Sequence, residues 1–241
     1  MLKKIAPLVF INLFTLSALA QKSSTIDKFA SVTLALGGNQ FTTAIAYQHL
    51  WKLGKKQKWE IGTGGRFTSI FGNNVYYKTA PAKLTSGKTG PGVLFADDIL
   101  QNIDSVKFNK TQFNALNISV NFAYNINNKF TAGFNIDAIG FSFGGKQNGT
   151  YYPNSGITTA TSAKPTSFNL LLVSDNDLGT LNSELYGAYK INNKWGAKLG
   201  FQFLFTEYTT ATAIQTTPDG KKNDRFRNKM SGISIGTTYK F

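Results

Sequence analysis

The chain has 241 residues, with 26 lysines and arginines against 12 acidic residues, no cysteine and a formal net charge of +14. Its hydrophobic content of 41% and aromatic content of 14% exclude a disordered chain, and the lack of cysteine excludes a disulfide-stapled scaffold. The mean hydropathy of −0.17 argues against a bundle of membrane helices, because each needs about 20 mostly apolar residues in a row.

The N-terminus has the pattern of a secretory signal. Lys3 and Lys4 precede a mostly apolar stretch over 5–19, and Ala18-Leu19-Ala20 supplies the small residues that a signal peptidase accepts. This small-residue exit favours cleavage over the alternative of a membrane anchor. We therefore expect residues 1–20 to be removed and residues 21–241 to form a single exported domain.

Eight segments then alternate between apolar and polar residues with the period of a β-strand. In the clearest of them, Leu116, Ile118 and Val120 face one way, while Asn117 and Ser119 face the other. In chain order the predicted strands cover about 31–36, 41–51, 59–71, 115–126, 130–143, 181–191, 195–206 and 232–241.

The fifth of these segments changes phase. Phe134 and Ile136 share one parity, whereas Ile139, Phe141 and Phe143 share the other. A β-bulge near 137–140 would explain the change, because it inserts one extra residue into a strand.

The connections are of two kinds. One set is short and polar, at 54–57, 127–129 and 192–194. The other set comprises the tight turn at 37–40 and long links at about 72–112, 144–180 and 207–229, and the two sets alternate along the chain. Two short turns lie in a recurring phrase, Tyr124 to Phe130 and Tyr189 to Trp195, which indicates a repeated hairpin.

The first long link carries two further features. Asp97, Asp98 and Asp104 lack the Asp-x-Asp-x-Asp-Gly order of a calcium loop, so we expect a solvated loop there. The apolar runs 92–95 and 99–100 are unusual for an exposed loop, and we expect them to pack over the barrel mouth or to contact a partner.

Two features favour a membrane barrel over a soluble β-sandwich. Aromatic residues gather at the strand ends beside the short turns, where a membrane interface would lie, at Trp51, Trp59, Tyr124, Phe130, Tyr189, Trp195 and Tyr239. The polar side of the strands carries charges that would make a poor dry core, namely Lys52, Glu60, Arg66, Asp137, Glu184, Lys190 and Lys198. The apolar side is therefore expected to face lipid, and in lipid the sheet must close on itself.

This pattern resembles the eight-stranded outer-membrane barrels of Gram-negative bacteria, the OmpA- and OmpX-like group. The resemblance is carried by the signal peptide, the eight alternating segments, the alternation of short and long connections, and the terminal run from Ile233 to Phe241. It implies an all-β, transmembrane, antiparallel up-and-down barrel in the cell outer membrane, with short periplasmic turns and long extracellular loops. It also implies lipid and lipopolysaccharide as partners, and Tyr239 and Phe241 as the signal that the barrel assembly machinery reads.

The sequence offers little for catalysis. His49 is the only histidine, and its parity places it outward with Tyr47 and Trp51 at the expected interface. With one histidine and no cysteine we expect no transition-metal site, and neither an enzyme nor a cofactor. Export and the barrel pattern argue against the nucleic-acid partner that the positive charge would otherwise suggest.

Two functions stay open. One is a non-enzymatic envelope-structural role, or a surface-binding role carried by the long loops, which would bind lipopolysaccharide, a surface or another protein. The alternative is a narrow porin-like channel or small-solute transporter through a polar lumen. The mixed signs of the inward charges favour a salt-bridged plug, because eight strands leave an interior just wide enough for side chains.

A basic group in the last long link is expected to meet anionic lipid head groups: Lys221, Lys222, Arg225, Arg227 and Lys229.

Overall fold

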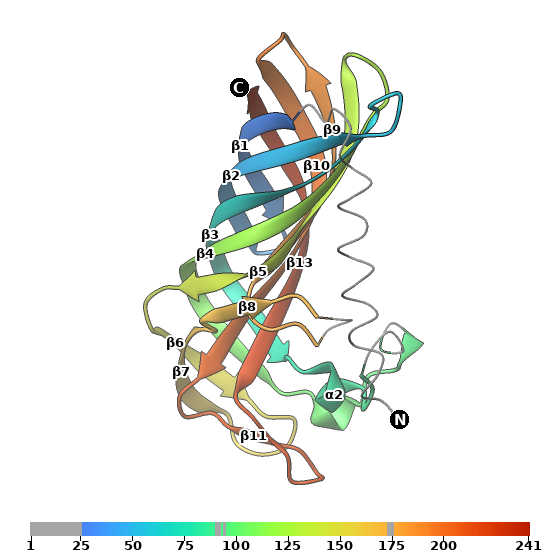
Figure 1. The fold of residues 1–241 in the computed structure, drawn as a ribbon. Helices are drawn as coiled ribbons and strands as arrows, with labels where there is room; N and C mark the ends of the chain where they lie inside the picture. The colour runs from blue at the N-terminus through green and yellow to red at the C-terminus, as the bar shows by residue number, and fades with distance from the viewer. Residues whose placement is uncertain (1–25, 90–92, 94, 173–175) are drawn as a thin grey trace, which may run out of the picture.

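The computed structural model describes residues 26–89, 93, 95–172 and 176–241, so the predicted signal peptide lies outside the described residues. Eight antiparallel strands form a closed ring, because each pairs with the next and the last pairs with the first (Figure 1). The eight strands are β1 (Ile26–Gly37), β2 (Gln40–Leu53), β3 (Trp59–Thr79), β4 (Ser105–Asn125), β5 (Phe130–Phe143), β9 (Leu181–Lys190), β10 (Trp195–Thr210) and β13 (Arg225–Lys240). The predicted all-β class and the number of strands in the ring are confirmed.

Apolar side chains of this eight-stranded ring point outward and polar ones point inward. On β4, Leu116 is 52% exposed while its neighbour Asn117 is 3% exposed. The period of two along each strand puts alternate residues on opposite faces, so the ring has an apolar outside and a polar inside. Among the described residues, no helix is long and apolar enough to cross a membrane.

Tight turns join the strands at one end of the ring, which we call the turn end. Here Asn127 and Asn192 occupy equivalent places in the turns β4–β5 and β9–β10. The side-chain oxygen of each accepts hydrogen bonds from two backbone N–H groups ahead of it, at 2.8 and 2.9 Å in both turns. This shared turn confirms the repeated hairpin. The β1–β2 turn, at the opposite end of these strands, consists of Gly38 and Asn39, with Gly38 at a φ of +53° that suits glycine.

The phase change in β5 is a β-bulge. Ile118 of β4 pairs with Ile139 and the next residue, Ser119, pairs with Asp137, so Ala138 is the extra residue. Asp137 is fully buried inside the ring, whereas Ile139 and Phe141 are 40% and 61% exposed outside it. The bulge predicted from the sequence is thus confirmed.

The long links are shorter than predicted, because the strands continue into them. β3 runs to Thr79 and β4 starts at Ser105, so 72–79 and 105–112 belong to strands. In these extensions the alternation has the opposite sense: Tyr77 and Phe108 are fully buried inside, while Tyr76 is 49% exposed outside. A search for strands with an apolar outer face therefore ends too early.

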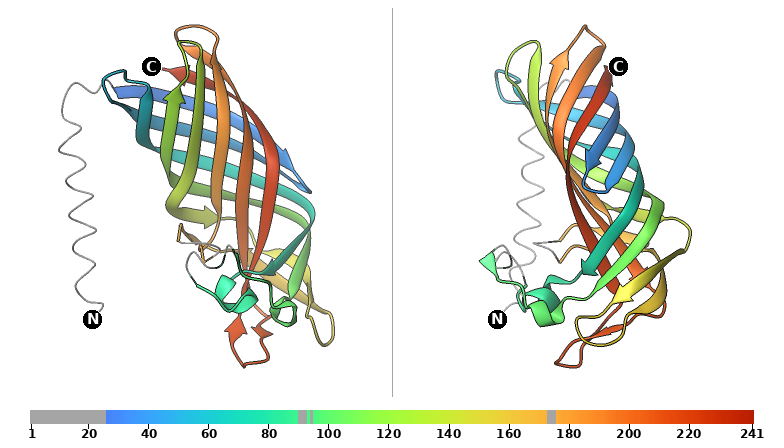
Figure 2. Two further views of the ribbon diagram at one scale, coloured as in Figure 1. Left: turned by 90° about the vertical axis from the view of Figure 1, so that its right-hand side faces the viewer. Right: turned by 180° about the vertical axis from the view of Figure 1, so that it is seen from behind.

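The remaining elements lie at the far end from the turns, which we call the loop end (Figure 2). They are the short helix α2 (Ala82–Thr85), the 3-10 turn η2 (Leu100–Asn102), and the strands β6 (Gln147–Tyr152), β7 (Thr159–Pro165), β8 (Phe168–Leu170), β11 (Gln215–Thr216) and β12 (Lys222–Asn223). Of these, β8 pairs with β5, and β11 pairs with β12.

At the loop end the sheet closes a second time with fewer strands. β13 pairs directly with β3 through Phe226 and Thr79, beyond the β1–β2 turn. On the other side, the β6–β7 hairpin bridges β4 and β10, where β5 and β9 have ended. The strands β3, β4, β6, β7, β10 and β13 thus form a six-stranded ring that continues the eight-stranded one.

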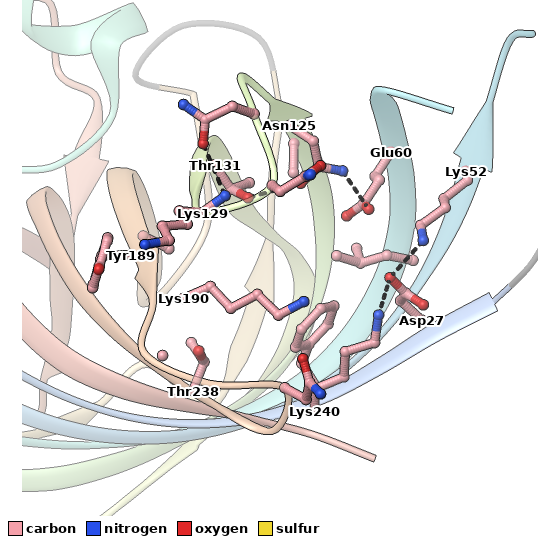
Figure 3. Close-up of a pocket in the computed structure, with 18 of the residues that line it drawn as sticks. Asp27, Lys52, Glu60, Asn125, Lys129, Thr131, Tyr189, Lys190, Thr238 and Lys240 are labelled. Atoms are coloured by element: carbon pink, nitrogen blue, oxygen red, sulfur yellow. Dashed lines mark hydrogen bonds and ion pairs between the residues drawn. The ribbon is translucent and has the colours of Figure 1, made fainter. Parts of the chain in front are cut away.

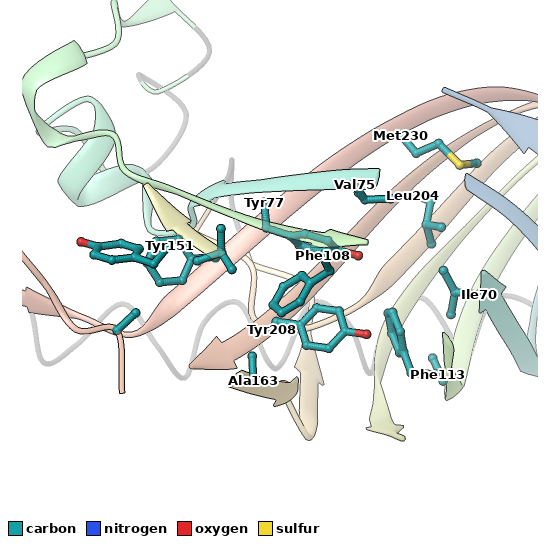
Figure 4. Close-up of a cluster of buried hydrophobic side chains, with 14 residues drawn as sticks. Ile70, Val75, Tyr77, Phe108, Phe113, Tyr151, Ala163, Leu204, Tyr208 and Met230 are labelled. Atoms are coloured by element: carbon teal, nitrogen blue, oxygen red, sulfur yellow. The ribbon is translucent and has the colours of Figure 1, made fainter. Parts of the chain in front are cut away.

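This six-stranded ring is filled by apolar side chains (Figure 4). Tyr208 lies at the centre, with its ring centroid 4.8 Å from that of Phe108, 5.1 Å from Tyr77 and 5.3 Å from Phe113. We call this cluster the aromatic core; its members are Ile70, Val75, Tyr77, Val106, Phe108, Phe113, Ala115, Tyr151, Ala163, Leu204, Tyr208, Ala213, Phe226 and Met230. The hydrophobic core thus lies at the loop end.

Candidate functional site

The middle of the lumen is held by a buried ion pair between β3 and β5. The Arg66 guanidinium donates to one oxygen of Asp137 from Nε at 2.9 Å and from Nη2 at 2.5 Å, and to Asn135 at 2.6 Å. The second Asp137 oxygen accepts from the Asn117 side chain at 2.8 Å and from the backbone N–H of Asn182 at 3.0 Å. All five residues are buried, so each charge exchanges its water for fixed partners.

A second buried ion pair joins β9 and β10. Lys198 Nζ lies 2.8 Å from Glu184 Oε2, and the Ser234 hydroxyl donates to the other Glu184 oxygen at 2.6 Å. Asn135 also donates to Glu184, at 3.2 Å, and thereby links this pair to Arg66. The two pairs form one polar layer across the lumen.

On the turn-end side of this layer, the lumen opens into a cavity of about 400 Å³ (Figure 3). Asp27 lies at its side and binds both Lys52, at 3.1 Å, and Lys240, at 2.6 Å. Glu60 accepts a hydrogen bond from Asn125 at 2.7 Å. Lys190 points into the cavity from the end of β9 (Figure 3). We call this space the mouth cavity.

The candidate residues from the sequence therefore fall into two groups. Arg66, Asp137, Glu184 and Lys198 meet in the middle of the lumen, whereas Lys52, Glu60 and Lys190 line the mouth cavity. Asp27 and Lys240, which bind each other there, were not among the candidates. The parity of the first predicted strand, extended back from residue 31 to residue 27, would have placed Asp27 inward.

Tyr239 and Phe241 lie on the outside of the ring, at the turn end. The two rings pack edge to face with centroids 5.2 Å apart, and Phe241 makes the same kind of contact with Tyr47 at 5.7 Å. The backbone N–H of Phe241 donates to the Lys28 carbonyl at 3.0 Å, which extends the seam between the last and first strands. Their role in assembly stays a prediction.

Two expectations about charged loop residues were wrong. Arg227 faces no lipid: it is 4% exposed and binds Glu207 at 2.8 Å, while Arg225 binds the other Glu207 oxygen at 2.8 Å. Asp104 is no solvated loop residue, because it is 6% exposed and accepts hydrogen bonds from the Tyr151 hydroxyl and the Asn154 backbone. In the first case a carboxylate of β10 binds two arginines of β13, and in the second a carboxylate directly before β4 binds β6 and the β6–β7 turn. Both sets of contacts depend on strand pairing, which a linear sequence does not reveal.

His49 faces outward and packs edge to face against Tyr47, with centroids 5.0 Å apart. Within the described part of the chain, no group of three or more histidine, cysteine or acidic residues could hold a metal ion. The site that the lumen offers is thus the mouth cavity.

No family model and no curated protein matches this sequence. Among solved structures, Neisserial surface protein A is 9% identical with a TM-score of 0.38, and the match covers 91% of this chain and all of that one. A major outer membrane protein of Thermus thermophilus is 12% identical with a TM-score of 0.41, covering 90% of this chain and 100% of that one. Ail, the attachment invasion locus protein of Yersinia pestis, is 10% identical with a TM-score of 0.32, covering 90% and 97%.

Proposed function

We propose that the chain is an outer-membrane β-barrel protein with a closed lumen, whose envelope-structural or surface-binding role is carried by the loop end. An apolar belt on all eight strands of the first ring supports the membrane location, because so large an exposed apolar surface needs an apolar solvent. Its members are between 38% and 62% exposed and include Val32, Leu34, Ile45, Phe67, Leu116, Ile118, Phe122, Phe141, Leu185, Leu199, Phe201, Ile233 and Ile235.

Aromatic pairs at the turn end support one interface of the bilayer there. Trp59 packs against Tyr124 with centroids 4.6 Å apart, and Trp195 against Tyr239 at 4.9 Å. Such amphipathic rings favour the head-group level of a membrane. The short turns at this interface support a periplasmic turn end and a six-stranded ring outside the cell, because the short turns of outer-membrane barrels face the periplasm.

The aromatic core is the observation that best supports a closed lumen. Tyr77, Phe108 and Tyr208 are fully buried within the six-stranded ring, so close-packed side chains fill the path that a solute would need. The polar layer of Arg66 and Glu184 lies across the wider ring as well. Transport through the lumen, the alternative reading of the sequence, finds no support in this arrangement.

Exposed apolar side chains at the loop end support surface binding. Phe95 is 91% exposed, Ile157 is 85% exposed and Leu100 is 74% exposed, each on a connection outside the eight-stranded ring. Each gains apolar burial when it meets a partner. The role therefore needs neither a catalytic group nor a cofactor.

Planar-bilayer recording of the refolded chain, residues 21–241, tests the closed lumen. We expect no discrete conductance steps from protein that a boiled-versus-unboiled gel shift identifies as folded. Steady steps would overturn the closed lumen.

Surface binding by the loop end can be tested with cells that carry this protein in their outer membrane. The measurement is the adsorption of these cells to a hydrocarbon-coated surface. The triple variant Phe95→Ser, Leu100→Ser and Ile157→Ser should lose binding, while Lys55→Gln at the turn end should keep it. Equal binding by the triple variant and the unchanged protein would remove the support for surface binding.

A further inference from the structure

The mouth cavity has a strong excess of positive charge. Seven lysines but only two carboxylates, Asp27 and Glu60, line it. Two of the lysines, Lys52 and Lys240, are already bound to Asp27. The other five are Lys56, Lys58, Lys129, Lys190 and Lys194.

None of these five ammonium groups has a carboxylate oxygen within 4.0 Å among the described residues. Lys58 donates to the Ile126 carbonyl at 3.4 Å, and Lys194 lies 6.0 Å from the ring centre of Tyr239. Within the described chain, the Lys190 ammonium makes neither a hydrogen bond nor a contact with an aromatic ring, and it points into the cavity (Figure 3). The like charges repel one another across the cavity, and an anion bound between them would remove that repulsion.

Three separate hairpins contribute lysines to the cavity. Lys56 lies in the β2–β3 turn, Lys129 in the β4–β5 turn, and Lys190 and Lys194 flank the β9–β10 turn. Residues distant in sequence thus surround one space, as at a binding site and unlike a charged run along one loop.

The walls add apolar surface to this charge. Phe29, Leu50 and Tyr186 line the cavity beside the lysines. A volume of about 400 Å³ lies within the range of small-molecule sites in proteins. Lysine is a compact donor of up to three hydrogen bonds, suited to phosphate and carboxylate oxygens.

We propose that the mouth cavity binds a small multivalent anion, a phosphate- or carboxylate-bearing molecule, between Lys190 and the lysines of the turns. Lys190 supplies the charge nearest the centre, and Lys56 and Lys129 close over the anion from the rim. The proposal goes beyond the role of the loop end and depends neither on a closed lumen nor on the side of the membrane that the cavity faces.

Calorimetric titration of the refolded chain in uncharged maltoside micelles tests this site. Inorganic pyrophosphate and citrate serve as the two probes, each at constant ionic strength, because screening weakens exposed charge pairs. We expect saturable binding of at least one probe. Tighter pyrophosphate binding would indicate a phosphate ligand, and tighter citrate binding a carboxylate ligand.

Charge-removing variants locate the bound anion. Lys190→Gln and Lys56→Gln should each weaken binding about tenfold, a change of 1.4 kcal/mol. Lys55→Gln is the matched control, because Lys55 lies in the same turn as Lys56 but outside the cavity lining. A gel shift verifies that each variant is folded.

Two results would overturn the proposal. One is the absence of saturable binding of either probe to folded protein. The other is equal weakening by Lys55→Gln and Lys190→Gln, which would mean attraction to the overall charge. A conducting barrel would overturn the closed lumen and leave this site untouched.

Discussion

The carboxylate of Asp137 and the guanidinium of Arg66 face each other inside the eight-stranded ring, directly before one extra residue in β5. Ala138, the bulged residue, follows Asp137 directly and resets the alternation of the strand. The strand can thus keep Asp137 in the lumen and still turn Ile139 and Phe141 outward. One backbone irregularity serves both the polar layer and the apolar belt.

Asp137→Ala should destabilise the barrel strongly. It leaves the Arg66 guanidinium buried without its counter-charge, and removing one partner of a buried pair costs about 3–5 kcal/mol. The double variant Arg66→Met with Asp137→Leu should lose much less, because no charge stays uncompensated. Urea titration in lipid vesicles measures both free energies of unfolding.

The exposed pair of Asp219 and Lys221 is the control for this experiment. Both side chains are 52% exposed, so Asp219→Ala should leave stability unchanged within error. A double variant that loses the sum of the two single losses at Arg66 and Asp137 would contradict coupling of the pair.

Deletion of Ala138 should leave the barrel folded. Ile139 then follows Asp137 directly and stays opposite Ile118, so Asp137 still faces the lumen and Ile139 and Phe141 still face outward, now in a strand without a bulge. The boiled-versus-unboiled gel shift compares the deletion variant with Ala138→Gly, which keeps the residue count. Loss of the shift on deletion alone would contradict the assignment of Ala138 as the extra residue.

Phe108→Ala should open the six-stranded ring while the eight-stranded ring stays intact. Phe108 is fully buried against Tyr77 and Tyr208, and truncation of a buried phenylalanine costs about 3–5 kcal/mol. Local unfolding should then expose the β6–β7 hairpin to trypsin. Mass spectrometry would detect increased cleavage at Lys146, where the hairpin begins.

Tyr152→Ala is the matched variant for that experiment. Tyr152 lies on β6 beside the buried Tyr151, but it is 37% exposed on the outer face. Its loss should change the trypsin pattern little. Equal cleavage in both variants would mean that the aromatic core does not hold the hairpin in place.

The eight-stranded ring could be predicted from sequence, because its strands alternate between apolar residues that face outward and polar residues that face the lumen. On β4, Leu116, Ile118 and Phe122 face outward and Asn117 and Ser119 inward, so a period of two defines the strand. The bulge was visible for the same reason, since it breaks that period at a single point. Inward charges such as Arg66 could be placed, but their partners depend on strand register.

The six-stranded ring could not be predicted, because its strands turn their apolar face inward and not outward. Val75, Tyr77 and Val106 point inward there, as in a soluble protein. Charged residues such as Lys78 and Lys164 lie on the outside. Its closure also rests on pairing over great sequence distances, such as Phe226 with Thr79. The mouth cavity was missed for a similar reason: three turns that look independent in the sequence surround it.

Alkaline pH should weaken the six-stranded ring through Tyr151. Burial, together with the hydrogen bond to the Asp104 carboxylate and its negative charge, raises the pKa of the Tyr151 phenol above its ordinary value of 10.0. Above pH 10.0 the unfolded chain releases this proton while the folded protein holds it, so the free energy of unfolding decreases as the pH rises further.

A difference titration at 295 nm between the unchanged protein and Tyr151→Phe isolates this one phenol. Its midpoint should lie well above pH 10 in the folded state and return to about 10 in denaturant. Asp104→Asn should lower the folded midpoint, because it removes the negative charge but keeps the phenol buried. An unchanged midpoint in Asp104→Asn would assign the whole effect to burial, and a midpoint of 10 in folded protein would contradict the buried pair.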